Sequence, residues 1–79
     1  MRLIQVLGPG CPKCDRLARN AEIAVCDAGV EARVERVTDM DQITTFGVMM
    51  TPALVIDGQV KIVGRVLAPE DIGRMLGKG

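Results

Sequence analysis

Two cysteines separated by two residues, Cys11 and Cys14, are the side chains of this sequence best suited to chemistry. They lie within Gly-Pro-Gly-Cys-Pro-Lys-Cys-Asp-Arg, residues 8–16. Two thiols at this spacing can close a reversible disulfide, bind a soft metal ion or form a structural disulfide. The sequence holds three cysteines, and this odd number argues against structural disulfides, which use thiols in pairs. Redox chemistry and metal binding are the two remaining interpretations.

The position of the pair at the expected start of a helix favours redox chemistry. Pro12 suits the first helical position, where its missing N–H costs nothing. Residues three apart on a helix are neighbours, so the two sulfurs can approach bonding distance. The free N–H groups and dipole of a helix N-terminus stabilise a thiolate, and Lys13 adds a positive charge between the cysteines. We therefore expect Cys11, the more exposed thiol, to attack a target disulfide, and Cys14, the more buried thiol, to resolve the mixed disulfide.

Metal binding by the same two thiols is the main alternative. Structural zinc sites and iron–sulfur clusters take four protein ligands, whereas this chain has three cysteines and no histidine. A two-thiolate Cu(I) or Zn(II) carrier or sensor stays open, because soft cations accept cysteine ligands. Met49 and Met50 are expected to fill the core or its rim rather than to bind copper. We expect no bound cofactor and no resident metal.

Hydrophobic periodicity identifies the elements that hold the pair. Residues 2–7 form an apolar run, which predicts a strand that ends at Gly8. Apolar residues spaced three and four apart then predict a helix that begins at Pro12 and stops at Gly29. The residues expected on its buried face are Leu17, Ala18, Ala21, Ala24, Val25 and Ala28. Residues 30–37 alternate between apolar and charged side chains, which predicts a second strand.

The second half of the sequence first predicts a short helix. Asp39 followed by Gln42 resembles a capping box, and the helix that it opens is expected to end at Gly47. The apolar residues of this helix are Met40, Ile43 and Phe46.

A β-hairpin and a last helix follow. The turn pair Asp57-Gly58 between two apolar runs is typical of a two-residue hairpin turn. The two strands of this hairpin are expected at residues 53–56 and 59–63. The last helix opens with Pro69, Glu70 and Asp71, which places acidic residues at its positive end. Its expected buried residues are Ile72, Met75 and Leu76.

The patterning of the four strands predicts the order of the sheet. The first and third strands are apolar on both faces and belong at its centre, whereas the second and fourth alternate and belong at its edges. A right-handed crossover pairs the second strand with the first, and the hairpin pairs the fourth with the third. We therefore predict an α/β fold of order β-α-β-α-β-β-α. Its four-stranded mixed sheet has strand order 2-1-3-4 and helices on both faces.

Composition limits the class of protein. Seventy-nine residues predict a single domain, residues 1–79. Ten basic and ten acidic residues give a formal net charge of zero, which argues against nucleic acid or an acidic membrane surface as a partner. No apolar run approaches the roughly 20 residues of a membrane span, and the first residues do not resemble a signal peptide. We expect a cytoplasmic monomer, in a compartment where thiols are kept reduced.

Three features of the sequence resemble the thioredoxin-like superfamily. They are Cys-Pro-Lys-Cys after the first strand, Met-Thr-Pro-Ala-Leu-Val-Ile-Asp-Gly around the third strand, and Gly64 after the fourth. The whole chain is similar to the small, glutaredoxin-sized members of archaea and bacteria, known as redox-active disulfide proteins. The resemblance implies a thioredoxin fold and a thiol–disulfide oxidoreductase, either a protein disulfide reductase or an electron carrier. It also implies Cys11 as nucleophile, Cys14 as resolving thiol, and a cis peptide bond at Thr51-Pro52 beside the active site.

The same resemblance implies substrates and partners. A disulfide-containing protein segment would lie against Pro12, Lys13, Thr51 and Pro52, with the backbone of Thr51 available for a short β-strand addition. The electron donor would be a flavoenzyme resembling thioredoxin reductase, or glutathione.

The sequence departs from typical relatives at three places. Gly10 stands where typical thioredoxins have tryptophan, and the strand before the motif offers Gln5 where they carry a buried acid. Residues 63–71 keep one glycine of the Gly-Gly-x-x-Asp signature by which glutaredoxins recognise glutathione. The third cysteine, Cys26, lies away from the buried stripe of the first helix, and we expect it to be partly exposed, as a packing residue or a site of intermolecular disulfide formation.

Overall fold

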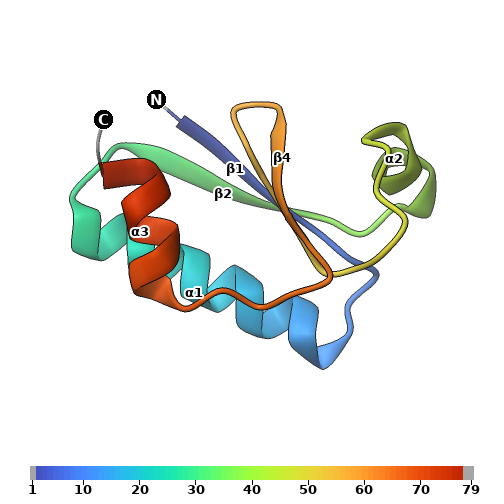
Figure 1. The fold of residues 1–79 in the computed structure, drawn as a ribbon, viewed down its shortest axis with the longest axis horizontal. Helices are drawn as coiled ribbons and strands as arrows, with labels where there is room; N and C mark the ends of the chain where they lie inside the picture. Colours follow the sequence, from blue (N-terminus) through green and yellow to red (C-terminus); the bar gives the residue numbers. More distant parts are fainter. Residues whose placement is uncertain (1, 78–79) are drawn as a thin grey trace.

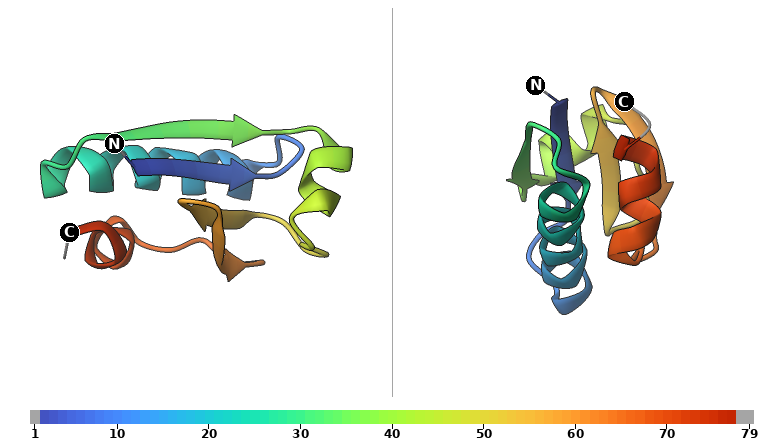
Figure 2. Two further views of the ribbon diagram at one scale, coloured as in Figure 1. Left: turned by 90° about the horizontal axis from the view of Figure 1, so that it is seen from above. Right: turned by 90° about the vertical axis from the view of Figure 1, so that its left-hand side faces the viewer.

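The computed structural model describes residues 2–77 as a mixed β-sheet with helices against both of its faces (Figure 1). Helices α1 (Pro12–Ala28) and α3 (Pro69–Gly77) lie along one face (Figure 2). Helix α2 (Met40–Thr45) lies at one end of the sheet and contributes to the core on the other face. The predicted element order is confirmed.

The sheet has the strand order β2-β1-β3-β4, as predicted. Its strands are β1 (Arg2–Leu7), β2 (Ala32–Val37), β3 (Ala53–Ile56) and β4 (Gln59–Val63). Strand β1 pairs in parallel with β2, whereas β3 is antiparallel to both β1 and β4. All four residues of β3 are buried, because this strand is covered on both faces.

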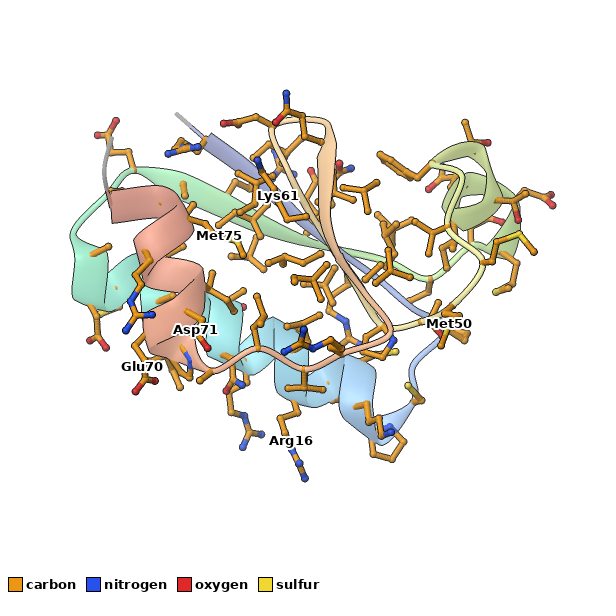
Figure 3. The ribbon with its side chains drawn as sticks, in the orientation of Figure 1. Arg16, Met50, Lys61, Glu70, Asp71 and Met75 are labelled. Atoms are coloured by element: carbon orange, nitrogen blue, oxygen red, sulfur yellow. The ribbon has the colours of Figure 1, made fainter. Side chains whose placement is uncertain are left out.

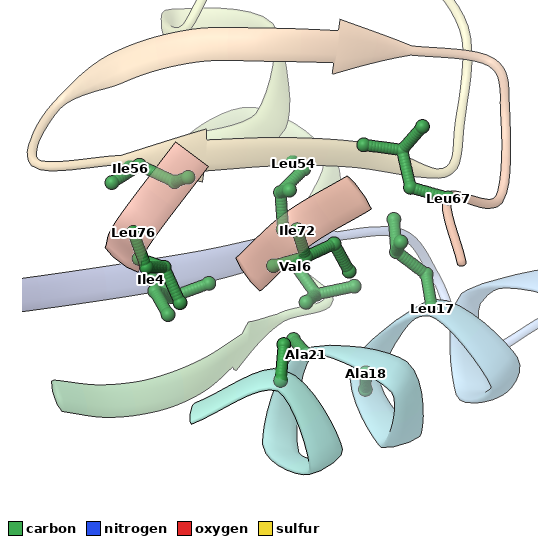
Figure 4. Packing of buried hydrophobic residues seen from close by; sticks show 11 residues of the cluster. Ile4, Val6, Leu17, Ala18, Ala21, Leu54, Ile56, Leu67, Ile72 and Leu76 are labelled. Carbon is green, nitrogen blue, oxygen red and sulfur yellow. The ribbon is translucent and has the colours of Figure 1, made fainter. Parts of the chain in front are cut away.

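Two hydrophobic clusters, one on each face of the sheet, form the core. Ile4 and Val6 of β1 face α1 and α3, where Leu17, Ile72 and neighbouring side chains pack against them (Figure 4). The next residue of β1, Leu7, points to the other face. It packs there with Val37, Ile43, Val48, Ala53 and Val55. Side-chain alternation along the strand thus divides the core between the two faces.

Helix α1 begins and ends where the sequence predicts. Cys11 is its N-cap, Pro12 its first residue, and Gly29 ends it in the left-handed conformation, with φ of 67°. Its buried residues are Cys14, Leu17, Ala18, Ala21 and Ala24. Ala28 was expected on the same buried face but is exposed. It lines an open groove against α3, where Gly73 has no side chain to cover it.

Other local differences from the prediction have simple causes. Strand β2 begins at Ala32 rather than at Val30, with a hydrogen bond from the N–H of Arg2 to the C=O of Glu31 just before it. At the N-cap of α2, the carboxylate of Asp39 accepts from the N–H of Asp41 at 2.9 Å, an Asx turn in place of the expected capping box.

The remaining elements follow their patterns closely. The hairpin turn has φ of 52° at Asp57 and 83° at Gly58, as a type I′ turn requires. In α3, Ile72 and Leu76 are fully buried while Met75 is only partly buried. Met40, on the first turn of α2, was expected to be part of its apolar face but is exposed. Among residues 2–77, the helices are too short or too polar to cross a membrane.

Candidate active site

The two cysteines of the motif lie where the first strand leads into the first helix. The chain leaves β1 through Gly8, Pro9 and Gly10 and enters α1 at Cys11. As N-cap, Cys11 has an extended backbone, and its sulfur accepts a hydrogen bond from the N–H of Cys14 at 3.3 Å. The Sγ atoms of the two residues are 2.7 Å apart, with both thiols free. The predicted juxtaposition of the two sulfurs is therefore present in the reduced protein.

The two thiols differ in burial and in acidity. Cys14 is 0% exposed, whereas Cys11 is partly exposed. Hydrogen bonds from the thiol and then the backbone N–H of Cys14 lower the pKa of Cys11 below the ordinary value for cysteine. Burial raises the pKa of Cys14, and its hydrogen bond to Cys11 raises it further. As the pH rises, Cys11 therefore loses its proton first, and Cys14 keeps the proton that it shares with the neighbouring thiolate.

This asymmetry predicts the pH dependence of alkylation. Because only the thiolate is nucleophilic, the rate of alkylation of Cys11 by iodoacetamide should rise with pH and level off above its pKa. The lowered pKa places the midpoint at a lower pH than for N-acetylcysteine. Replacing Cys14 with alanine removes the thiol donor but keeps the backbone N–H, so the midpoint should move part of the way back toward higher pH.

The measurement is the alkylation rate as a function of pH in a Cys26→Ser background, which removes the exposed third thiol. The matched control is the same background with Cys14 intact. An identical midpoint with and without the Cys14 thiol would contradict the assigned hydrogen bond.

Gly8 is a residue of this site whose role the sequence analysis missed. A Cβ atom at position 8 would fall onto Sγ of Cys14 and lie 2.9 Å from its Cβ. The N–H of Gly8 donates to the C=O of Val37 at 2.9 Å, which holds its backbone in place. The absent side chain is therefore what gives the buried sulfur its space. A glycine directly after a buried central strand is the sequence signal that could have indicated this close approach.

The segment before β3 meets the cysteines from the other side. The Thr51–Pro52 peptide bond is cis, as the resemblance implied. The Cβ of Thr51 lies 3.9 Å from the point where a side chain of Gly8 would begin, so Thr51 and Cys14 adjoin the same small space. Pro52 is buried, and its C=O accepts a hydrogen bond of 2.7 Å from the N–H of Gly64. Residues from three parts of the chain thus meet at the cysteine pair.

The other expected site residues are solvent-accessible. Pro12 and Lys13 are both exposed on the first turn of α1. Met49 and Met50 were expected to fill the core or its rim, but they are 94% and 61% exposed, so neither fills the core. The side chain of Met50 lies instead against Gly64, beside the Thr51–Pro52 segment, on the rim of the site (Figure 3). Exposed apolar side chains at this rim are suited to contact with another protein.

The described residues offer Cys14 no buried acidic side chain as a proton acceptor. Gln5 on β1 is only partly buried, and the part of the chain that the structure describes contains no buried polar or charged side chain.

Cys26 is exposed, as expected, and lies 12 residues along α1 from Cys14, about 18 Å at 1.5 Å per residue. An intramolecular disulfide between Cys26 and the pair is therefore excluded by distance.

Comparison with known proteins gives the same fold and chemistry. A family model described as a thioredoxin domain matches residues 2–77. A thioredoxin of Methanothermobacter thermautotrophicus is 42% identical over 76 residues, which cover 96% of this chain and 99% of the relative. A thioredoxin of Methanocaldococcus jannaschii is 33% identical over 72 residues, which cover 91% of this chain and 83% of the relative. The chain therefore belongs to the thioredoxin domain family and is a thioredoxin-like thiol–disulfide oxidoreductase.

Proposed function

We propose that Cys11 and Cys14 are the redox couple of this oxidoreductase and reduce disulfides in protein substrates. The observation that carries the proposal is the contact of 2.7 Å between an accessible thiol of lowered pKa and a buried thiol of raised pKa. The first is suited to attack, because it forms a thiolate in contact with solvent. The second is suited to resolution, because it keeps its proton until a mixed disulfide has formed beside it.

The proposed reaction transfers two electrons to the substrate. The Cys11 thiolate attacks one sulfur of the target disulfide, an intermolecular S–S bond forms, and the other target sulfur leaves as a thiolate. Cys14 then loses its proton to that thiolate or to water and attacks Sγ of Cys11. The second target sulfur leaves as a thiolate and the protein holds a Cys11–Cys14 disulfide. The target has gained two electrons, and its two thiolates take up the proton of Cys14 and the proton that Cys11 had released to water.

The substrate segment is proposed to lie against Thr51 and Pro52, with Pro12 and Lys13 at its edge. Within residues 2–77, the N–H and C=O groups of Thr51 take part in no backbone hydrogen bond. Thr51 lies near the cysteine pair, because its Cβ and Cys14 both border the space where a side chain of Gly8 would begin. An extended peptide could therefore pair with Thr51 while its disulfide reaches Cys11, a short form of β-strand addition.

A soft-metal carrier is the second candidate, because two free thiols at 2.7 Å also form a donor pair. No group of three or more His, Cys, Asp or Glu side chains comes together in residues 2–77, so any metal held there would take the two thiolates as its main protein ligands. Because Cys14 is 0% exposed, a metal ion from solvent has little access to its sulfur. This burial favours electron transfer by the pair over metal binding.

One experiment separates the two functions. The reduced protein is dialysed with equimolar Cu(I) or Zn(II), analysed for retained metal, and assayed in parallel for reduction of a model disulfide. Either a flavin-dependent thioredoxin reductase or glutathione serves as donor. We expect turnover with at least one donor and a mass loss of about two daltons on mild oxidation, localised to Cys11 and Cys14. Stoichiometric retained metal without turnover would establish the carrier instead.

A further inference from the structure

The basic side chains of the protein divide into two groups. Four arginines form ion pairs with carboxylates at 2.7–3.3 Å. They are Arg2, Arg33, Arg36 and Arg74. Within residues 2–77, the other basic side chains form no ion pair. They are Lys13, Arg16, Arg19, Lys61 and Arg65. All of these except Lys61 belong to the first half of α1 or to the loop after β4.

Three of these cations share one side of helix α1. Lys13, Arg16 and Arg19 follow one another at intervals of three residues, and all are exposed. Arg16 points away from the sheet into solvent (Figure 3). The series begins between the two cysteines, so its first charge is within the motif and the next is less than one helical turn beyond Cys14.

The fourth cation, Arg65, is brought to the same side by tertiary hydrogen bonds. On one side of it, the N–H of Gly64 donates to the C=O of Pro52 at 2.7 Å. On the other side, the amide of Asn20 on α1 donates to the C=O of Leu67 at 2.8 Å. The loop that carries Arg65 therefore runs from the Pro52 segment to α1. Asn20 is four residues after Arg16, hence on the same side of the helix.

Two acidic side chains lie near these cations on α1, and neither forms an ion pair with them. Glu22, three residues after Arg19, is exposed. The first ten residues of α1 contain one acid, Asp15, and its carboxylate is paired with Arg36 of β2 at 2.7 Å. The whole chain has a formal net charge of zero. The positive charge around the cysteines therefore comes from where the basic residues lie, not from an excess of basic over acidic residues. We call Lys13, Arg16, Arg19 and Arg65 the cationic surface.

We propose that the cationic surface is a docking surface for protein partners whose disulfide is flanked by acidic residues. The proposal rests on the redox function of Cys11 and Cys14 and adds the charge of the partner. Unpaired cations around a reactive site raise the encounter rate with acidic surfaces and disfavour basic ones. Their effect falls as salt is added, because exposed charges are screened beyond about 8–10 Å at physiological ionic strength.

The test uses three peptides that contain the same intramolecular disulfide, flanked by glutamate, lysine or glutamine. The rate constant for reduction of each peptide by the reduced protein is measured at low and high salt. We expect the acidic peptide to react about tenfold faster than the neutral one at low salt, and the basic peptide more slowly than both. The acidic advantage should shrink to about twofold or less in about 1 M salt.

Charge-reversal variants locate the effect on the surface. Arg16→Glu and Arg65→Glu are each expected to lower the ratio of acidic to neutral rates about threefold to fivefold. The matched control is Lys61→Glu, which makes the same charge change at an exposed, unpaired cation on β4, far across the molecule from Arg16 (Figure 3). It should change the ratio less than about 1.5-fold.

Each outcome decides a separate point. If Lys61→Glu lowers the ratio of acidic to neutral rates as much as Arg16→Glu does, the net charge of the protein, not the cationic surface, sets the preference. If the wild type shows no preference for the acidic peptide, the docking proposal is overturned and the redox function stays in place. Glutathione disulfide, a small anionic substrate, is run in parallel. If it shows the whole effect and the acidic peptide none, the surface selects small anions and the protein-partner proposal is wrong. If no peptide is reduced, including the neutral one, the redox function itself fails.

Discussion

Replacing Cys11 with serine should abolish disulfide reduction, with a loss of about a thousandfold or more in turnover. The substitution removes the accessible sulfur of lowered pKa, and the remaining thiol of the pair cannot replace it. Cys14 is 0% exposed and its pKa is raised, so it neither reaches a target disulfide nor forms a thiolate readily. The measurement is the rate of reduction of a protein disulfide by the reduced variant, with folding verified by circular dichroism.

The two other cysteines provide matched comparisons. Cys14→Ser should keep the first attack but leave the target bound to Cys11 as a mixed disulfide, which mass spectrometry would detect as a covalent adduct. Cys26→Ser makes the same chemical change at an exposed position about 18 Å away along α1 and should keep turnover within about twofold. Equal adduct formation by Cys11→Ser and Cys14→Ser would contradict the assigned roles.

Replacing Gly8 with alanine should destabilise the protein and disturb the cysteine pair. The added methyl group would overlap Sγ of Cys14 and approach its Cβ to 2.9 Å, and both atoms belong to a fully buried side chain. Overpacking of this kind typically costs about 1–3 kcal/mol. For a chain of this length the loss corresponds to a decrease of about 5–20 °C in Tm.

The same substitution should also change the chemistry of Cys11. Displacing Cys14 Sγ lengthens the contact of 2.7 Å that stabilises the Cys11 thiolate, so the pKa of Cys11 should rise. Thermal unfolding and the pH profile of alkylation measure the two effects independently. Both should appear together, because one steric overlap causes them.

Gly73 offers a matched control for Gly8→Ala. A Cβ atom at this position in α3 would have no heavy atom within 4 Å, and the residue is inside a helix. Gly73→Ala should therefore stabilise the protein by about 0.5–1 kcal/mol, through helix propensity and reduced freedom of the unfolded chain. A Gly8→Ala variant as stable as the wild type, with an unchanged alkylation profile, would show that Gly8 is not needed to accommodate Cys14.

Much of the fold could be predicted because it depends on near neighbours along the chain. Pro12 and Gly29 mark the ends of α1 through their own backbone preferences, and the Asp57-Gly58 pair defines the hairpin in the same way. The distribution of apolar residues between the faces of each strand then places β1 and β3 at the centre. The juxtaposition of Cys11 and Cys14 belongs to this class, since residues three apart at a helix start are neighbours in any fold.

The predictions that failed concern burial at the ends of elements. Ala28, Met40 and Met49 are apolar and exposed, although the sequence pattern placed Ala28 and Met40 on apolar helix faces and Met49 in the core or at its rim. Whether such a side chain is buried depends on which residues from other parts of the chain pack against it, and the hydrophobic periodicity of its own helix does not give this. Ala28 lines an open groove together with Gly73. Met50, in contrast, lies against Gly64 at the rim, one of its two expected positions.

By itself, the sequence determined the juxtaposition of the two cysteines at a helix start, the elements that present them and the order of the sheet. Local backbone preferences decide the first two, and the apolar patterning of the strands with the handedness of the crossover decides the third. Only the tertiary structure decided what surrounds the pair. Gly8 and Thr51 meet beside Cys14, and Gly64 is hydrogen-bonded to Pro52. These contacts join residues that are distant in the chain, and no local pattern encodes them. The space for the buried sulfur, the placement of Arg65 beside α1 and the resulting charge around the site therefore arise from the packing of the whole domain.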